Sequence, residues 1–185
     1  MSKMGKYLML LALLPLLAII PTGCAPTGAP TGAPTGAVAV YVTDPGPVSN
    51  VSHINITASE VKIHKAGDDG EGEWISLNIT NPSFDLIALN ETGLKELLAQ
   101  GNVPAGNYTQ IRMTIAGVNV TLDGETQNAT VPSGELKFVR PFQVVDGNTT
   151  ILSLDFDAGK SVTITGTSKV IVHPVVTLNV SMQKE

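Results

Sequence analysis

Hydrophobic and polar residues alternate along most of the chain beyond residue 37, with the period of two that is typical of β-strands. The first run covers residues 38–43, and Asp44-Pro45-Gly46 follows it with residues that favour a turn. Further strands are predicted wherever apolar residues repeat on one parity, within residues 74–79, 84–89, 108–122, 152–156, 162–164 and 170–182. We expect the last of these to be one long strand.

The parity of the apolar residues changes within one predicted strand. Apolar residues alternate from Ile54 to Ala58 and again from Val61 to Ile63, but the second set has the opposite parity. An extra residue in a strand shifts which side chains face the core, so a β-bulge near Ser59 would direct both sets inward.

Helical spacing occurs in a single stretch after residue 37. Thr92 can cap a helix, the leucines at 94, 97 and 98 would form its apolar face, and Gly101 can close it. Elsewhere there are about nine strands with turns every 8 to 12 residues, and the Asp-Gly pairs at 123–124 and 146–147 predict hairpin turns. The helices that βαβ units need are missing, so we predict an all-β antiparallel sandwich with one short helix.

The start of the chain has the pattern of an export signal. Lys3 and Lys6 precede a fourteen-residue apolar run over residues 7–20. A membrane-spanning helix needs about twenty apolar residues, so a cleaved signal peptide over residues 1–23 is expected.

Cys24 follows this segment directly and is the only cysteine, so it cannot form an internal disulfide. A single cysteine in this place resembles a lipoprotein processing box, although Pro21 stands where such boxes usually have Leu. Two alternatives remain open: lipidation of Cys24, which would tether the protein to the membrane, or an ordinary signal peptide that leaves an incidental thiol.

Ala-Pro-Thr-Gly is written three times over residues 25–36. Proline at every fourth position prevents helix and central-strand pairing, and an extended segment of this length reaches up to roughly 40 Å. The expected organisation is therefore a signal peptide over 1–23, a lipidated Cys24 with spacer over 24–37, and a β-sandwich domain over 38–185.

Charge excludes one class of partner. The chain has 11 basic and 16 acidic residues, a net charge of −5, and removal of Lys3 and Lys6 with the signal leaves 9 − 16 = −7. Nucleic-acid binding requires a basic face, and the sequence has no run of Lys or Arg, so we expect no nucleic-acid partner.

Asparagine is frequent where strands are predicted, although it is a poor strand former. Of eleven asparagines, nine begin an Asn-x-Ser/Thr sequon, and only Asn81, blocked by Pro82, and Asn102 do not. The nine predicted glycosylation sites are Asn50, Asn55, Asn78, Asn90, Asn107, Asn119, Asn128, Asn148 and Asn179.

Strand geometry gives these sequons a common orientation. Residues i and i+2 share a face, so the acceptor Asn and its hydroxyl partner would both point outward while the middle residue points to the core. The middle residues Val51, Ile56, Ile79, Tyr108, Val120 and Val180 are of core type. Asn and Thr could simply fill the solvated face of a sheet, but we favour N-glycosylation of an exported protein, most readily an archaeal one.

Catalytic and metal-binding patterns are scarce. His53 and His64 are eleven residues apart in one predicted strand, which is roughly 35 Å of extended chain, and His173 is remote from both. Asp155 and Asp157 share a strand face and could hold Ca²⁺ or serve as the paired carboxylates of a hydrolase. No P-loop, dinucleotide-binding or Gly-x-Ser-x-Gly motif occurs, so we expect no cofactor, no metal and no catalytic site, with a secreted hydrolase or Ca-binding module as the alternative.

Several short motifs together resemble one family. They are Val42-Thr-Asp-Pro45, Ser59-Glu-Val-Lys-Ile-His64, Trp74-Ile-Ser-Leu77, Phe84-Asp-Leu-Ile87, Pro104-Ala-Gly-Asn-Tyr-Thr-Gln-Ile-Arg112, Val131-Pro-Ser-Gly134 and Leu154-Asp-Phe-Asp157. In this order they resemble the domain of unknown function 4382 family of secreted and lipoprotein-type proteins of bacteria and archaea. The resemblance implies a prealbumin-like β-sandwich and no particular activity.

Within the most specific of these motifs, Pro104 and Gly106 are expected to set a turn and Tyr108 to bury its ring, while Arg112 is expected to pair with an acidic neighbour. For the whole chain we expect a lipid-anchored, N-glycosylated domain on the extracellular face of the membrane. Its role would be non-catalytic: binding, adhesion or envelope structure, with an envelope protein or polysaccharide as possible partner.

Overall fold

The structure is a computed structural model that describes residues 32–44, 50–67, 70–165 and 169–183. The chain divides into the units Met1–Thr31 and Gly32–Glu185, and every described residue belongs to the second. The predicted signal peptide, Cys24 and the first part of the spacer therefore lie outside the described residues. Across the described ranges, no helix is long and apolar enough to cross a membrane.

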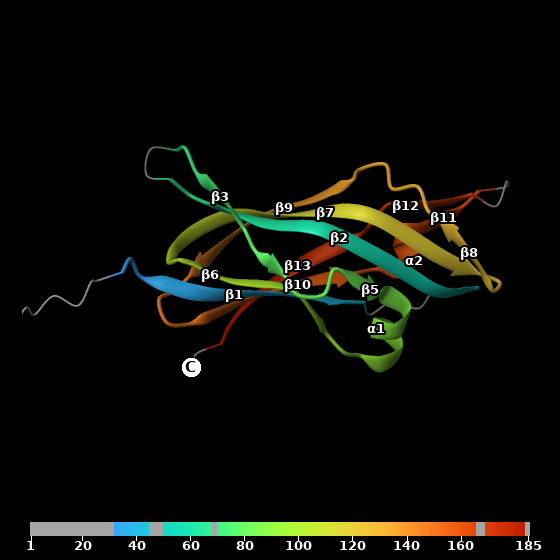
Figure 1. The fold of residues 1–185 in the computed structure, drawn as a ribbon, viewed down its shortest axis with the longest axis horizontal. Coiled ribbons are helices and arrows are strands. Elements are labelled where there is room, and N and C mark those ends of the chain that lie inside the picture. The colour runs from blue at the N-terminus through green and yellow to red at the C-terminus, as the bar shows by residue number, and fades with distance from the viewer. Residues whose placement is uncertain (1–31, 45–49, 68–69, 166–168, 184–185) are drawn as a thin grey trace, which may run out of the picture. The chain divides into compact units, whose positions relative to one another are not determined.

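One sheet, here called sheet A, is centred on β1 (Thr35–Thr43), in which Val38, Val40 and Val42 are buried. Its strand order is β13 (Val176–Gln183), β10 (Thr149–Phe156), β1, β6 (Glu96–Pro104) and β4 (Asn78–Ile79), of which all but β4 are labelled in Figure 1. The β1–β10 pair is parallel and the other pairs are antiparallel. Sheet A is therefore mixed, whereas the sequence predicted antiparallel pairing throughout.

The second sheet, sheet B, is built on two long antiparallel strands, β2 (Val51–Lys65) and β7 (Gly106–Leu122). Two short strands pair with the edge of β2 that faces away from β7, namely β3 (Glu73–Ser76) and β5 (Ser83–Asp85). Two strands pair with the edge of β7 that faces away from β2, namely β8 (Glu125–Asn128) and β9 (Glu135–Val144). Strands β11 (Val162–Ile164) and β12 (Val170–Val172) form a separate pair.

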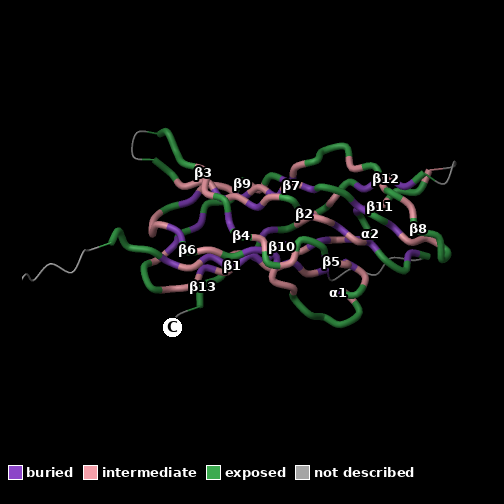
Figure 2. Tube along the Cα trace, in the orientation of Figure 1, coloured by how far each residue is buried: buried purple, intermediate pink, exposed green. Residues whose placement is uncertain are grey.

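The core lies between the two sheets, where the inward residues of both form one buried cluster (Figure 2). Phe84 of sheet B meets Phe156 of sheet A edge to face, with ring centroids 5.6 Å apart. The predicted bulge in β2 is confirmed: the register with β7 shifts on both sides of Ala58, and Ile54, Ile56, Ala58, Val61 and Ile63 are all at most 2% exposed. The all-β sandwich predicted from the alternation is thus the observed fold.

The helix prediction is wrong in number and in place. The described residues contain two short helices, α1 (Leu86–Thr92) and α2 (Ala158–Ser161), and the stretch predicted to be helical after Thr92 instead contains β6. Asp85 caps α1 through the backbone N–H of Ile87, and Gly93 ends it with φ of +63°. Leu98 and Ala99 are buried because β6 pairs with β1, so tertiary pairing outweighed a helical spacing of leucines.

Two further strand predictions need correction. Residues 84–89 were predicted as one strand, but the chain leaves β5 at Asp85 and enters α1. The predicted last strand is divided into β12 and β13, and Pro174 lies in the break, where it cannot donate a ladder hydrogen bond. Asp146-Gly147 does form a turn, but it joins β9 in sheet B to β10 in sheet A and so closes no hairpin.

The third Ala-Pro-Thr-Gly repeat is part of the fold, since β1 begins at Thr35 rather than at residue 38. Pro34 accepts a hydrogen bond from the N–H of Ala105, and Gly147 donates to the carbonyl of Thr35. Gly36 is buried so tightly that a Cβ there would lie 2.4 Å from the carbonyl oxygen of Val145. The spacer's glycine is therefore required for packing at this position.

Candidate functional site

All nine sequon asparagines lie within the described residues, and none of them is buried. Six are exposed, namely Asn50, Asn78, Asn107, Asn119, Asn128 and Asn179; the half-buried ones are Asn55, Asn90 and Asn148. Of the middle residues, Val51, Ile56, Tyr108 and Val120 are at most 7% exposed, and Ile79 and Val180 pack against the core. The outward orientation expected of the strand sequons is therefore what the fold provides.

Asn50 lies in a turn directly before β2, with φ of +65°, and two further sequons depart from the strand geometry. Asn90 lies on α1, and its amide donates to the carbonyl of Asp44 at 3.3 Å. Asn148 lies in the turn before β10, and its hydroxyl partner Thr150 points inward, 1% exposed, donating to the carbonyl of Gln143. Their surface position thus comes from a helix and a turn, which the alternation argument did not anticipate.

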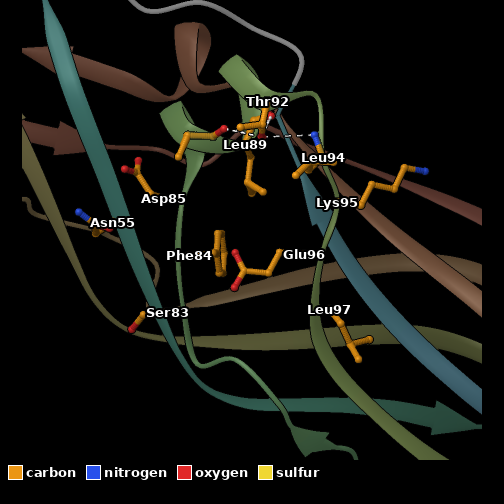
Figure 3. A pocket seen from close by; sticks show the side chains of 11 residues that line it. Asn55, Ser83, Phe84, Asp85, Leu89, Thr92, Leu94, Lys95, Glu96 and Leu97 are labelled. Carbon is orange, nitrogen blue, oxygen red and sulfur yellow. Dashed lines mark hydrogen bonds between the residues drawn. The ribbon is translucent and has the colours of Figure 1, made fainter.

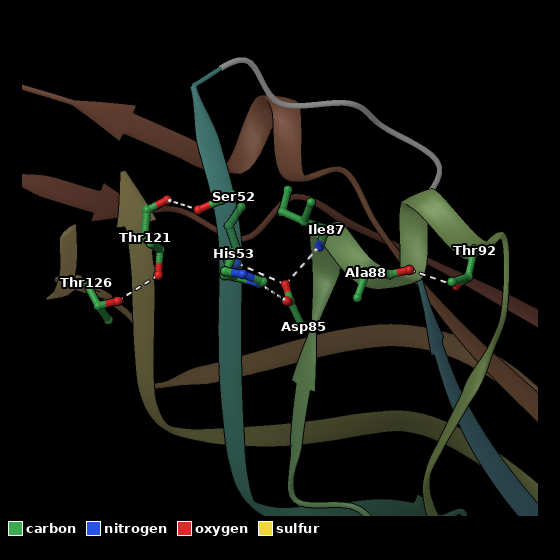
Figure 4. Close-up of polar contacts among 9 residues, drawn as sticks. Ser52, His53, Asp85, Ile87, Ala88, Thr92, Thr121 and Thr126 are labelled. Carbon is green, nitrogen blue, oxygen red and sulfur yellow. Dashed lines mark hydrogen bonds and ion pairs between the residues drawn. The ribbon is translucent and has the colours of Figure 1, made fainter. Parts of the chain in front are cut away.

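Three sequons form a row across sheet B. Asn55 of β2 is opposite Asn119 of β7, which is opposite Asn128 of β8. Neighbouring strands lie about 4.8 Å apart, so this end of the sheet carries acceptor amides on three adjacent strands. Thr121 and Thr126 add a hydroxyl pair at 2.8 Å on the same strands (Figure 4).

A His–Asp pair that the sequence pattern did not predict lies next to this row. Nδ1 of His53 is 2.6 Å from Oδ2 of Asp85, and Oδ1 of Asp85 accepts from the N–H groups of Ile54 and Ile87, each at 3.1 Å (Figure 4). No sequence signal points to this contact, because it depends on the pairing of β2 with β5, which places residues 32 positions apart side by side.

The surroundings of this pair indicate a structural role. The neighbouring hydroxyl of Ser52 donates to the backbone carbonyl of Thr121, and the hydroxyl of Thr121 is bonded to the hydroxyl of Thr126. Neither hydroxyl is therefore held against the imidazole as a nucleophile would be. Asp85 caps α1 and fixes the start of β2 at the same time. The pair therefore joins β2 to the β5–α1 connection.

A hollow with a volume of about 570 Å³ lies next to these residues, between β5, α1 and β6 (Figure 3). Phe84 and Leu89 give it an apolar floor, and Glu96 points toward Phe84 while Lys95 points away (Figure 3). Asp85 and Asn55 stand at its rim. With one carboxylate over an apolar floor, and with Asp85 already bonded to His53, this hollow offers contacts for binding rather than a pair of groups for acid–base chemistry.

Trp74 lies on the half of sheet B without the sequon row, and its ring is covered by the chain's own cations. The guanidinium of Arg112 is 4.3 Å from the ring centroid, and Nζ of Lys62 is 5.8 Å away. Arg112 also pairs with Glu135 at 3.4 Å, which confirms its predicted acidic partner. These contacts make Trp74 a packed element of the sheet rather than an open aromatic platform.

Tyr108 has the buried position predicted for it. Its ring is 1% exposed and stacks on Phe142 at 5.3 Å between centroids, and its hydroxyl donates to the carbonyl of Pro104 at 2.8 Å. Burial, with a contribution from Glu73, raises the pKa of Tyr108 to about 12. Gly106 makes the turn with φ of +148°.

The two carboxylates proposed as a paired site have different environments. Asp157 caps α2 and is bonded to the side chain of Lys160, which lowers the pKa of Asp157. Asp155 lies on β10, and its Oδ1 is buried with no hydrogen-bond partner; burial raises its pKa, against the nearby Lys95. Within the part of the chain that the structure describes, no group of three or more His, Cys, Asp or Glu side chains could hold a metal ion.

Comparison with known proteins gives one structural match and one family match. The structure is similar to that of a Bacteroides fragilis NCTC 9343 protein described as a "putative cell adhesion protein", with a TM-score of 0.32 and 10% identity, over 82% of this chain and 46% of that one. The chain thus spans about half the length of that protein. No curated protein matches the chain.

The family match covers the whole sandwich except its last strand. The model of the family described as "Domain of unknown function (DUF4382)" matches residues 35–174, from the first residue of β1 to the proline before β13. Because this match covers more than half of the chain, the protein belongs to the DUF4382 family.

Proposed function

We propose that this chain is an N-glycosylated domain on the extracellular face of the membrane, held there by a lipid on Cys24, with a non-catalytic role in binding, adhesion or envelope structure. The spacer would separate the sandwich from the lipid surface. A lipid chain gains about 0.8 kcal/mol per buried methylene, so lipidation of Cys24 would supply the membrane contact. An archaeal cell, which glycosylates exported chains, is the proposed source.

The observation that carries this proposal is the placement of the nine sequons. None of the nine acceptor asparagines is buried, whereas four of the middle residues are at most 7% exposed. A solvated sheet face could be made of Thr and Lys at lower cost in strand propensity, whereas glycosylation requires asparagine at these positions.

The ion pairs within the fold support the non-catalytic part of the proposal. His53 and Asp85 are bonded to each other, Asp157 to Lys160, and Arg112 to Glu135. Each of these side chains therefore already has a charged partner within the fold. A hydrolase needs a carboxylate pair free to meet substrate, roughly 5 to 10 Å apart.

Peptide mapping of protein purified from its native host tests the glycan assignment. We expect glycan mass on peptides that contain sequons and none on peptides that contain Asn81 or Asn102, which are the internal controls because they lack a sequon. Glycan-free peptides at all nine sequons would refute the assignment.

The lipid assignment is tested separately with Cys24→Ser. This variant is expected to appear in the medium, while the parent chain stays with the membrane fraction. A variant that remains with the membrane would contradict the lipid anchor and leave the glycan result unaffected.

A further inference from the structure

A hollow of about 520 Å³ lies on the outer face of sheet A and has no charged residue in its lining. It extends over β4, β6, β1 and the start of β10. Its polar groups are the amides of Asn78, Gln100 and Asn102 and the hydroxyls of Tyr41 and Thr149. The volume is within the range of about 300–1,000 Å³ in which proteins hold small ligands.

The shape of this hollow follows from the sequence of the central strand. Val38, Val40 and Val42 of β1 face the core, so Ala37 and Ala39 face outward. Alanine is disfavoured in strands, and on a central strand it leaves a low floor between longer neighbours. Ala39 is opposite Gln100 on one side and Ile151 on the other, and Tyr41 is opposite Leu97 and Ser153.

The chemistry of the lining selects one class of ligand. Amides and hydroxyls both donate and accept hydrogen bonds, as the hydroxyl groups of a sugar require, and the half-buried ring of Tyr41 can pack against the C–H face of a sugar ring. A phosphate, a carboxylate or a metal ion would need a charged partner, which this lining lacks.

One source of sugar is attached to the hollow itself, because Asn78 is both a lining residue and a sequon acceptor. Asn78 is exposed, opposite Gln100 at the edge of the sheet, while its neighbour Ile79 packs against the core. A glycan attached to this amide can extend over Gln100 and Ala39 toward Tyr41.

We propose that the glycan on Asn78 lies in this hollow and packs against Tyr41, so that it covers the outer face of sheet A as an intramolecular ligand. This inference rests on the proposed glycosylation. It assigns Tyr41, Gln100 and Asn102 as residues that position the first sugars.

Hydroxyl-radical labelling of the natively glycosylated protein tests this. Tyr41 and Tyr108 are the only tyrosines after the predicted signal, and Tyr108 is 1% exposed, so it reports whether the fold is intact. Thr80→Ala removes the Asn78 sequon by changing an exposed residue. Thr130→Ala is the matched control, since it removes the sequon of Asn128, which lines none of the hollows described here.

We expect Tyr41 to be labelled several-fold more in Thr80→Ala than in the parent, with no change in Thr130→Ala and with Tyr108 protected in all three. If Tyr108 also becomes labelled, the variant has unfolded, and Asn78→Gln replaces it with the same expectation. Glycan on the Asn78 peptide together with unchanged Tyr41 labelling would overturn this inference and leave the proposed function standing. An unmodified Asn78 in the parent would also overturn it, while the other eight sites decide the proposed function.

Discussion

Replacement of Asp85 should destabilise the protein more than replacement of any other single polar side chain described above, because Asp85 serves three partners. It caps α1 through Ile87, accepts from the N–H of Ile54 at the start of β2, and pairs with His53. Asp85→Ala removes all three contacts. Asp85→Asn keeps an oxygen for the two N–H groups and loses the charge.

The magnitude can be worked from these contacts. Loss of the N-cap costs about 1 kcal/mol. An unpaired, partly buried N–H of Ile54 costs about 1 to 3 kcal/mol. The His53 side chain is 56% exposed, so its pair with Asp85 adds less than about 1 kcal/mol after solvent screening. Asp85→Ala should therefore cost about 3 kcal/mol, Asp85→Asn about 1 kcal/mol, and His53→Ala less than about 1 kcal/mol.

Urea unfolding followed by the fluorescence of Trp74, the only tryptophan, measures these differences in free energy of unfolding. An unchanged slope with urea would show that the variants unfold by the same transition. The reasoning is refuted if Asp85→Ala is within about 0.5 kcal/mol of the parent, the scatter expected of an ordinary surface substitution, or if Asp85→Asn is as costly as Asp85→Ala.

Three further changes test other parts of the structure. Gly36→Ala should destabilise by about 1 to 3 kcal/mol because the new methyl would overlap the carbonyl oxygen of Val145, whereas Gly117→Ala, with nothing within 4 Å, should be neutral or slightly stabilising in the same urea assay. Tyr108→Phe should cost about 1 kcal/mol through the lost bond to Pro104, and a cost near zero would contradict that bond's contribution. Asp155→Asn should stabilise the protein at neutral pH. Because burial raises the pKa of Asp155 in the folded state, the protonated carboxyl favours folding below pH 3.8, the pKa in the unfolded chain, and this stability is lost as the pH rises through the folded-state pKa. The gain in free energy of unfolding from Asp155→Asn should therefore vanish in measurements made below pH 3.8, and a gain that is independent of pH would contradict the reasoning.

Local patterns predicted the sandwich because apolar and polar residues alternate along its strands. The valines of β1 and the parity change around Ala58 are sufficient to identify inward faces and a bulge, since a strand has a fixed period of two. The sequons on strands were placed at the surface for the same reason.

Features that depend on pairing between distant segments could not be predicted. The parallel β1–β10 pair, the strand that replaces the helix expected after Thr92, and the contact of His53 with Asp85 all depend on which strands become neighbours. The hollow over Ala39 has the same origin, because its walls come from four strands. Spacing along one segment carries no information about these partners.

The intact mass of the protein purified from its native host is the most direct test of the central claim, that outward asparagines on a lipid-tethered sandwich carry glycans. The full polypeptide is 19.3 kDa, and removal of the signal lowers this value. We predict a mass above that of the processed polypeptide by several glycans and a lipid, with the glycan part removed by chemical deglycosylation. A single species at the bare polypeptide mass would contradict the claim.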